Sequence, residues 1–213
     1  MMGADRRSRR WCRLAACLLA VSAVPAAGTA NDDGRALIAA VRAQDAEASR
    51  ALIDGGAAVD AVQPDGATAL HWAAYHDAVE LVDLLVGAGA AVDAANDYGV
   101  TPLGLACDNA AAATVARLLA AGADPNRARG TGETPVMTCA RTGSVEAVRV
   151  LLAHGADPSA AEPWHGQTAL MWAAGGGHAG AARALLEHGA EVEARSKGGF
   201  TALLIAARED DPA

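Results

Sequence analysis

Short amphipathic segments recur along the chain. In residues 79–85 and 145–152, apolar side chains fall at positions i, i+3 and i+4, which predicts helices with one buried face. Each segment runs into a Leu-x-x-x-Gly-Ala ending, where glycine can adopt the left-handed conformation that ends a helix. This ending occurs five times, with its glycine at Gly56, Gly89, Gly122, Gly155 and Gly189. The pattern therefore predicts five related helices.

A second phrase precedes each of the later endings and is represented by Thr68-Ala-Leu-His-Trp-Ala-Ala74. Its threonine recurs at Thr68, Thr101, Thr134, Thr168 and Thr201, with spacings of 33, 33, 34 and 33 residues. Threonine is a good helix N-cap, proline is favoured at the next position, and a glycine two residues before each threonine suits a tight turn. Two interlocked phrases with one period predict a solenoid of stacked helical units.

The 33-residue period and the Thr-Pro-Leu-His-type start resemble those of the ankyrin repeat. The resemblance implies an all-α solenoid of stacked helix-turn-helix units with β-turn fingers. The expected ankyrin-repeat domain covers residues 31–213, with units at about 31–63, 64–96, 97–129, 130–163 and 164–196 and a partial unit at 197–213. The first unit lacks the threonine start, and the 34-residue spacing enlarges one finger around residues 160–165. The last unit ends before a second helix, so we expect a truncated gene or a fragment.

Composition agrees with this reading, because 52% of the residues are apolar but only 3% are aromatic. Alanine and glycine favour thin helices that pack closely in a nearly linear core.

Residues 1–30 follow a different pattern, that of a secretory signal peptide. A stretch rich in arginine from Arg6 to Arg13 precedes an apolar run at 14–24, and small residues follow up to Ala30. The run is too short to span a bilayer. Cleavage after Ala26 and cleavage after Ala30 both fit, and Ser8-Arg9-Arg10 leaves the twin-arginine route open beside the general one. We expect a bacterial exported protein, periplasmic or secreted, without membrane insertion after cleavage.

Charge argues against nucleic acid as a partner. The chain has 17 basic and 25 acidic residues, and the five arginines and single aspartate of the leader leave 12 basic and 24 acidic residues in 31–213. The array therefore has a net charge of −12 and contains one lysine, Lys197. Nucleic-acid binding depends on Lys and Arg that neutralise phosphates.

The histidines are assigned structural roles. The resemblance implies inter-repeat hydrogen bonds for His71 and a place between helices for His178. His154 and His188 precede the glycine at a helix end, where an imidazole favours the negative pole. We expect surface contacts for His76 and His165. His71 and His76 do not share a helix face, so no metal site is predicted, and no cofactor is expected.

Two other patterns look chemical but have structural explanations. Residues 175–180 match G-x-G-x-x-G, yet they follow a helix rather than a strand, so we expect a turn between helices. Cys107 and Cys139 lie in neighbouring repeats, where helices stack about 8–10 Å apart. That separation predicts two small core residues rather than a disulfide.

The finger tips and the exposed ends of the first helices remain for function. The resemblance implies that this concave surface binds partner proteins, and packing or partial exposure is expected for Trp72 and Trp172. The candidate partner-binding residues are Asp65, Tyr75, His76, Asp97, Tyr98, Asp108, Asn109, Glu133, Arg141, Trp164, His165, Gln167, Lys197 and Phe200.

The leading hypothesis is a monomeric, non-enzymatic exported scaffold that binds an unidentified protein through an acidic concave face. The alternatives are the ankyrin portion of a longer enzyme and a periplasmic protective factor for a redox enzyme.

Overall fold

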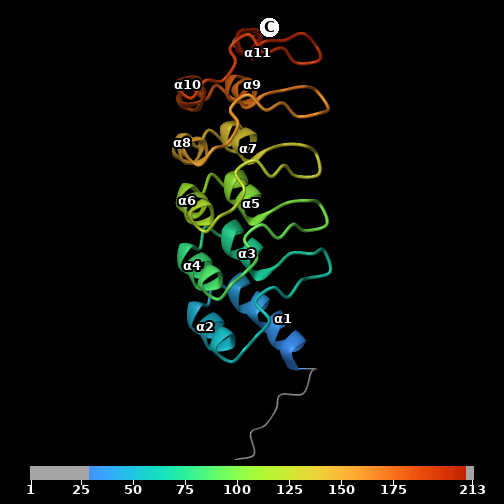
Figure 1. Ribbon diagram of the computed structural model, residues 1–213, viewed down its shortest axis with the longest axis vertical. Helices are drawn as coiled ribbons and strands as arrows, with labels where there is room; N and C mark the ends of the chain where they lie inside the picture. The colour runs from blue at the N-terminus through green and yellow to red at the C-terminus, as the bar shows by residue number, and fades with distance from the viewer. Residues whose placement is uncertain (1–28, 210–213) are drawn as a thin grey trace, which may run out of the picture.

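The computed structural model describes residues 29–209, which form eleven α-helices stacked in two columns (Figure 1). The first column holds the first helix of each unit: α1 (Thr29–Arg42), α3 (Ala69–Tyr75), α5 (Pro102–Asp108), α7 (Pro135–Thr142), α9 (Ala169–Gly175) and α11 (Ala202–Glu209). The second column holds α2 (Ala46–Asp54), α4 (Val79–Gly87), α6 (Ala112–Ala120), α8 (Val145–Ala153) and α10 (Ala179–Glu187). The all-α repeat architecture is confirmed.

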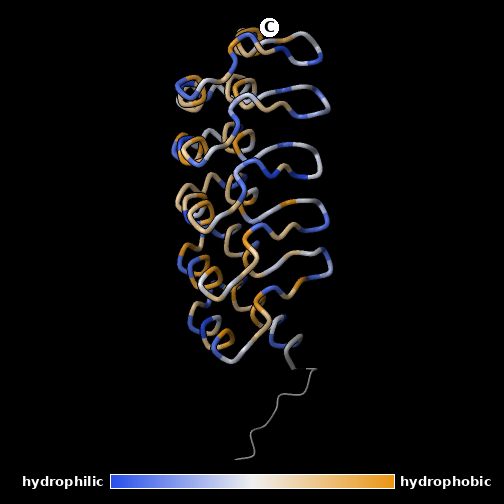
Figure 2. Tube along the Cα trace, in the orientation of Figure 1, coloured by the Kyte–Doolittle hydropathy of each residue, from blue (hydrophilic) through white to orange (hydrophobic). Residues whose placement is uncertain are grey.

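The core is a continuous layer between the two columns. The two helices of each of the first five units contact each other, and each helix from α1 to α9 contacts the equivalent helix of the next unit. The third residue of the threonine phrase is buried in successive units, as at Leu70, Leu103 and Leu170. Leu203 occupies the same position in α11 and is 76% exposed, because no further unit covers it within residues 29–209. Figure 2 shows apolar residues along the helices and mostly polar residues at the finger tips.

The threonine phrase caps most first-column helices as predicted. The hydroxyl oxygens of Thr101 and Thr168 accept hydrogen bonds from the backbone N–H of Gly104 and Met171. Thr134 departs from the prediction: its hydroxyl is buried without a hydrogen-bond partner, and Pro135 follows it at the first helical position. Steric preorganisation by proline therefore starts α7 without the side-chain cap.

The glycines adopt the predicted left-handed conformation. Gly155, just beyond the end of α8, has φ +87°, and Gly99 in a finger turn has φ +71°. The corresponding glycines of the other units also have positive φ. Both kinds of turn signal are confirmed.

The fingers stack on one another through backbone hydrogen bonds. The N–H of Asp97 donates to the carbonyl of Asp65, and the same bond joins Gly130 to Tyr98 and Lys197 to His165. Pro163 occupies the donor position between the third and fourth fingers and has no N–H. The regular ladder of the fingers is therefore interrupted before the enlarged finger.

The enlarged finger contains one extra residue inside its hairpin. In the regular fingers the closing N–H···O bond joins residues four apart, for example Asn96 to Val100. In the enlarged finger Glu162 bonds to Gln167, five residues away. An isolated β-bridge between Ala161 and Thr168 lies next to it. The predicted position of the insertion agrees with this geometry.

Polar side chains after the second helices link successive units, which the sequence analysis did not predict. A carboxylate oxygen of Asp60 accepts from the N–H of Ala91, and Asp93 accepts from Asp124. The amide oxygen of Asn126 accepts from the N–H of Asp157. Several acidic residues therefore stabilise the stack itself.

The prediction for the two cysteines was wrong. Cys107 in α5 and Cys139 in α7 form a disulfide with their Cα atoms 4.7 Å apart, and both residues are fully buried. The 8–10 Å spacing refers to helix axes, whereas Cα atoms lie about 2.3 Å from each axis. Facing Cα atoms can therefore approach within the range of a disulfide, which joins the third and fourth units.

The predicted leader lies, up to residue 28, outside the described residues, and so do residues 210–213 of the partial unit. Within the described part of the chain, no helix has both the length and the apolar character needed to cross a membrane.

Candidate partner-binding surface

The fingers and the first-column helices share one side of the array, which we call the finger face. Two grooves that are lined by tryptophan open on it. The Trp72 groove has a volume of about 340 Å³ and is lined by Asp65, Ala67, His71, Trp72, Tyr75, Asn96 and Leu105. The Trp172 groove has a volume of about 310 Å³ and is lined by Thr131, Glu133, Glu162, Trp164, His165, Gln167 and Trp172.

The Trp72 groove contains a tightly connected aromatic cluster. The indole N–H of Trp72 donates to the side-chain oxygen of Gln63 at 3.0 Å, and the Arg42 guanidinium lies 4.5 Å from the ring centroid. Tyr75 meets the ring edge-on and His76 stacks on it, with centroids 5.9 and 6.0 Å away. Such contacts hold the indole in one orientation.

His71 forms the floor of this groove and links two units. Its Nδ1 accepts from the backbone N–H of Thr68 at 3.1 Å, so in the neutral ring Nε2 carries the proton. Nε2 lies 3.0 Å from the carbonyl oxygen of Val100 in the next finger and donates to it. Burial lowers the pKa of His71 below its ordinary value of 6.5, against smaller opposing effects of Val100 and Asp65. The inter-repeat role predicted for His71 is confirmed.

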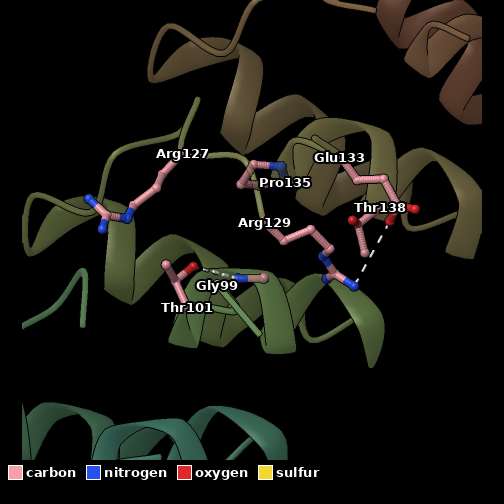
Figure 3. A pocket seen from close by; sticks show the side chains of 8 residues that line it. Gly99, Thr101, Arg127, Arg129, Glu133, Pro135 and Thr138 are labelled. Atoms are coloured by element: carbon pink, nitrogen blue, oxygen red, sulfur yellow. Dashed lines mark hydrogen bonds and ion pairs between the residues drawn. The ribbon is translucent and has the colours of Figure 1, made fainter. Parts of the chain in front are cut away.

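Ion pairs fill the finger face between the two grooves. The two carboxylate oxygens of Asp108 each accept from one guanidinium, that of Arg129 and that of Arg141, both at 2.9 Å. Arg129 also lies 3.9 Å from the carboxylate of Glu133. Figure 3 shows the Arg129 side chain pointing toward Glu133 and that of Arg127 pointing away from the pair. The pocket drawn there has a volume of about 10 Å³, about that of one water molecule.

The expected acidic character of the concave face therefore does not extend across its centre. Two arginines balance Asp108 and Glu133, while other acidic residues, such as Asp60 and Asp93, are used in the loops after the second helices.

In the Trp172 groove, the enlarged finger is organised around the buried carboxylate of Glu162. This carboxylate accepts from the backbone N–H groups of Trp164, His165 and Gln167, at distances of 2.6 to 3.0 Å. Burial by itself raises the pKa of Glu162, but these three hydrogen bonds and the nearby His165 together lower it below 4.5. Glu162 is therefore ionised at neutral pH, and its bonds fix the backbone around Trp164, a residue that is 71% exposed.

Trp172 occupies the repeat position of Trp72 but has fewer partners. Both residues are half-buried. Of the two roles expected from the sequence, packing and partial exposure, the structure shows partial exposure. The Arg141 guanidinium lies 5.7 Å from the Trp172 centroid, and the indole N–H is buried without a hydrogen-bond partner. Glu162 begins its finger at the position that Gln63 has in the finger beside Trp72. The carboxylate oxygens of Glu162 accept from the backbone of its own finger.

The structure places the fourteen predicted residues in three groups. Asp65, Tyr75 and His76 belong to the Trp72 region, with Asn109, whose amide donates to the carbonyl of Tyr75. Asp108, Glu133 and Arg141 form ion pairs, and Glu133 also lines the Trp172 groove with Trp164, His165 and Gln167. Asp97, Tyr98, Lys197 and Phe200 are exposed on other fingers.

Sequence reasoning missed Arg42, Gln63, Arg129 and Glu162. Arg42 and Arg141 both occupy the eighth position of the threonine phrase, and each contacts the tryptophan at the fifth position of the next unit. Comparing these two positions between units would have found both pairs. Glu162 and Arg129 are each the first residue of a finger. The residue type at this position differs from unit to unit, so comparison of the repeats does not single them out.

The remaining motifs have structural roles. His154 and His188 lie 2.9 and 2.8 Å from the carbonyls of Val150 and Ala184 at the ends of their helices. His178 bonds to the carbonyl of Arg141 in the preceding unit at 3.0 Å. Residues 176–178 form the turn between α9 and α10, as predicted. No group of three or more potential metal ligands occurs among residues 29–209.

Comparison with family models identifies the class of protein. The model for ankyrin repeats (3 copies) matches residues 13–96, 36–129, 79–162 and 159–212, which together span most of the chain. The protein therefore belongs to the ankyrin-repeat family, whose repeats are generally protein–protein interaction modules. A comparison with curated proteins found no match.

Proposed function

We propose that this protein is an exported, non-enzymatic scaffold that binds a partner protein through its finger face. The observation that carries the proposal is the pair of grooves on that face, each lined by a half-buried tryptophan with an exposed aromatic residue beside it. Aromatic residues and arginine are enriched among residues that dominate binding energy. The ion pairs between the grooves give the same face polar groups that can orient a partner.

The disulfide supports export. Cys107 and Cys139 are fully buried and bonded in the structure, and disulfides persist mainly in oxidising compartments. The predicted leader, with its arginines, apolar run and small residues, fits the same location. The two observations are independent, because one comes from the leader and the other from the core.

Partner capture tests the binding proposal. Purified wild-type protein and the variants Trp164→Ala and Tyr98→Ala would be compared in quantitative capture from an extract of the source cells. Arg183→Ala is the matched control, because Arg183 is exposed on α10 in the second column. We expect about a tenfold loss of the captured partner with the aromatic variants, from truncation of a binding hot spot, and no loss with the control. Retention of every partner by both aromatic variants would refute binding at the finger face.

Fractionation tests export. The full chain with a C-terminal tag would be expressed in a bacterial host, and the tagged product would be located and its N-terminus determined. We expect a periplasmic or secreted product that begins after Ala26 or Ala30 and contains no free thiols. A full-length cytoplasmic product with two free core thiols would contradict the proposal.

A further inference from the structure

The Trp172 groove has the charge and the aromatic surface that suit a cationic side chain. Two of its lining residues, Glu133 and Glu162, are carboxylates, and its lining contains no lysine or arginine. Glu162 is buried with its pKa lowered, so its charge persists in the folded protein at neutral pH. A cation entering the groove would meet negative charge at the first residue of the enlarged finger and at Glu133.

Two indole rings line this groove without the close aromatic packing present around Trp72. Trp164 in the enlarged finger is 71% exposed, and Trp172 on α9 is half-buried. Tryptophan is the best aromatic partner for a cation. The Arg141 guanidinium lies 5.7 Å from the Trp172 centroid, a longer contact than the 4.5 Å between Arg42 and the Trp72 ring, so Trp172 is less closely covered by an arginine of its own chain.

The carboxylate of Glu133 forms only a long ion pair with Arg129. Its ion pair with Arg129 measures 3.9 Å, whereas Arg129 is bonded to Asp108 at 2.9 Å. An incoming ammonium or guanidinium group can therefore take Glu133 while Arg129 keeps Asp108. The net charge of −12 in residues 31–213 also favours the approach of a basic partner.

From these observations we infer that the Trp172 groove binds a lysine or arginine side chain of the partner protein, held between Trp164 and Trp172 and paired with Glu133. The inference rests on the proposed function, since it names the partner chemistry for the same face. A groove of about 310 Å³ accommodates one long side chain together with part of its backbone.

The Trp72 groove provides an internal comparison. Its single acidic lining residue is Asp65, and its indole already has Arg42 at 4.5 Å and Gln63 as a hydrogen-bond partner. An added cation would compete there with contacts that are already made. The inferred site therefore belongs to one groove and not to both.

NMR titration of the full chain with short peptides tests the inference. The probes are nine-residue peptides of glycine and alanine with one central residue: lysine, arginine, norleucine or glutamate. The indole N–H resonances, assigned with Trp→Phe variants, report separately on Trp72, Trp164 and Trp172. We expect the lysine and arginine peptides to shift Trp164 and Trp172 but not Trp72, with about tenfold tighter binding than the norleucine peptide.

Two variants locate the charge. Glu133→Gln should weaken binding of the lysine peptide about tenfold, whereas Asp65→Asn, which changes a carboxylate in the other groove, should leave it unchanged. Thermal melts would establish that both variants are folded. If Glu133→Gln does not fold, Glu133→Asp replaces it as a variant that keeps the charge and shortens the side chain. Equal binding of the lysine and norleucine peptides, preference for the glutamate peptide, or equal shifts at Trp72 would each overturn the inference.

The outcome is separable from that of the proposed function. If Trp164→Ala abolishes partner capture but Glu133→Gln does not and the peptides show no charge preference, the finger face binds a partner without a basic anchor. If capture survives Trp164→Ala and Tyr98→Ala, the proposed function itself fails.

Discussion

The two tryptophan grooves are built on one repeat position and differ in how completely their polar groups are satisfied. In each, an arginine at the end of the preceding first-column helix lies over the tryptophan ring. Trp72 donates to Gln63, whereas the indole N–H of Trp172 has no partner. The polar group of the tryptophan is therefore satisfied in the Trp72 groove, whereas in the Trp172 groove it is left without a hydrogen-bond partner.

The side chain that begins each finger distinguishes the two grooves. In the regular finger, Gln63 begins a hairpin that closes four residues later at Ala67, and its side chain is free to accept from Trp72. In the enlarged finger, three backbone N–H groups turn toward Glu162 and occupy its carboxylate. Asn96 at the start of a regular finger is occupied in the same way, because its side-chain oxygen accepts from the N–H groups of Tyr98 and Val100. In a repeat array, one side chain can thus change the chemistry of a surface while the helices keep their packing.

The largest expected effect comes from the disulfide that lies between the two regions. Its closed loop spans a sequence separation of 32, for which chain entropy gives about 4 kcal/mol of stabilisation. Replacing both cysteines, Cys107→Ala with Cys139→Ala, should lower the free energy of unfolding by about that amount, measured by urea unfolding. It should also let the Trp72 and Trp172 regions unfold at different urea concentrations, because coupling between repeats is then weaker.

Reductant supplies the control for that experiment. Dithiothreitol should destabilise the wild-type protein and leave the double variant unchanged. A wild-type protein whose unfolding is insensitive to reductant under denaturing conditions would contradict the presence of the disulfide in solution.

Glu162→Gln tests the structure of the enlarged finger and should cost about 2 kcal/mol, because hydrogen bonds to a charged acceptor are replaced by weaker ones. Since the pKa of Glu162 is lowered in the folded state, its contribution is present above about pH 4.5 and is lost as the pH falls through the folded-state pKa. Urea unfolding of wild type and variant across this range measures the difference. Asp65→Asn is the comparison for the regular finger, where the carboxylate accepts from Ala67 alone, and it should cost less.

His71→Met tests the other groove and should cost about 1–2 kcal/mol, since the bonds to Thr68 and Val100 are lost while the apolar volume is retained. Methionine is the natural residue at the same position of the fifth unit, Met171. The pKa of His71 is lowered in the folded state, so below pH 6.5 the unfolded chain binds a proton that the folded ring does not. The wild-type protein should therefore lose stability relative to the variant as the pH falls below 6.5. A constant difference between the two across that range would show that His71 accepts the proton in the folded state.

Repeated features were predictable from the sequence, and features specific to one unit were not. The period located the helices and the caps, because these occur in several units with the same residue types. The role of His71 came from the resemblance to the ankyrin repeat, since the other threonine phrases have no histidine at this position. Glu162 and Arg129 escaped prediction because each depends on neighbours that only the folded backbone brings together. The disulfide was missed for a geometric reason. The prediction used the spacing of the helix axes, but the distance between facing Cα atoms determines whether two cysteines can form a disulfide.

The smallest expected effect is the sharpest test of the comparison between the two tryptophans. Trp72→Phe removes the bond to Gln63 and should cost about 1 kcal/mol more than the loss of ring contacts alone. Trp172→Phe affects a ring with fewer partners, and it also removes a buried N–H that has no hydrogen-bond partner, which offsets part of the cost. Urea unfolding of the two single variants should therefore give a larger loss at Trp72. Equal losses would mean that the Trp172 indole finds an acceptor in solution, and the Trp172 groove would then be as complete as the other.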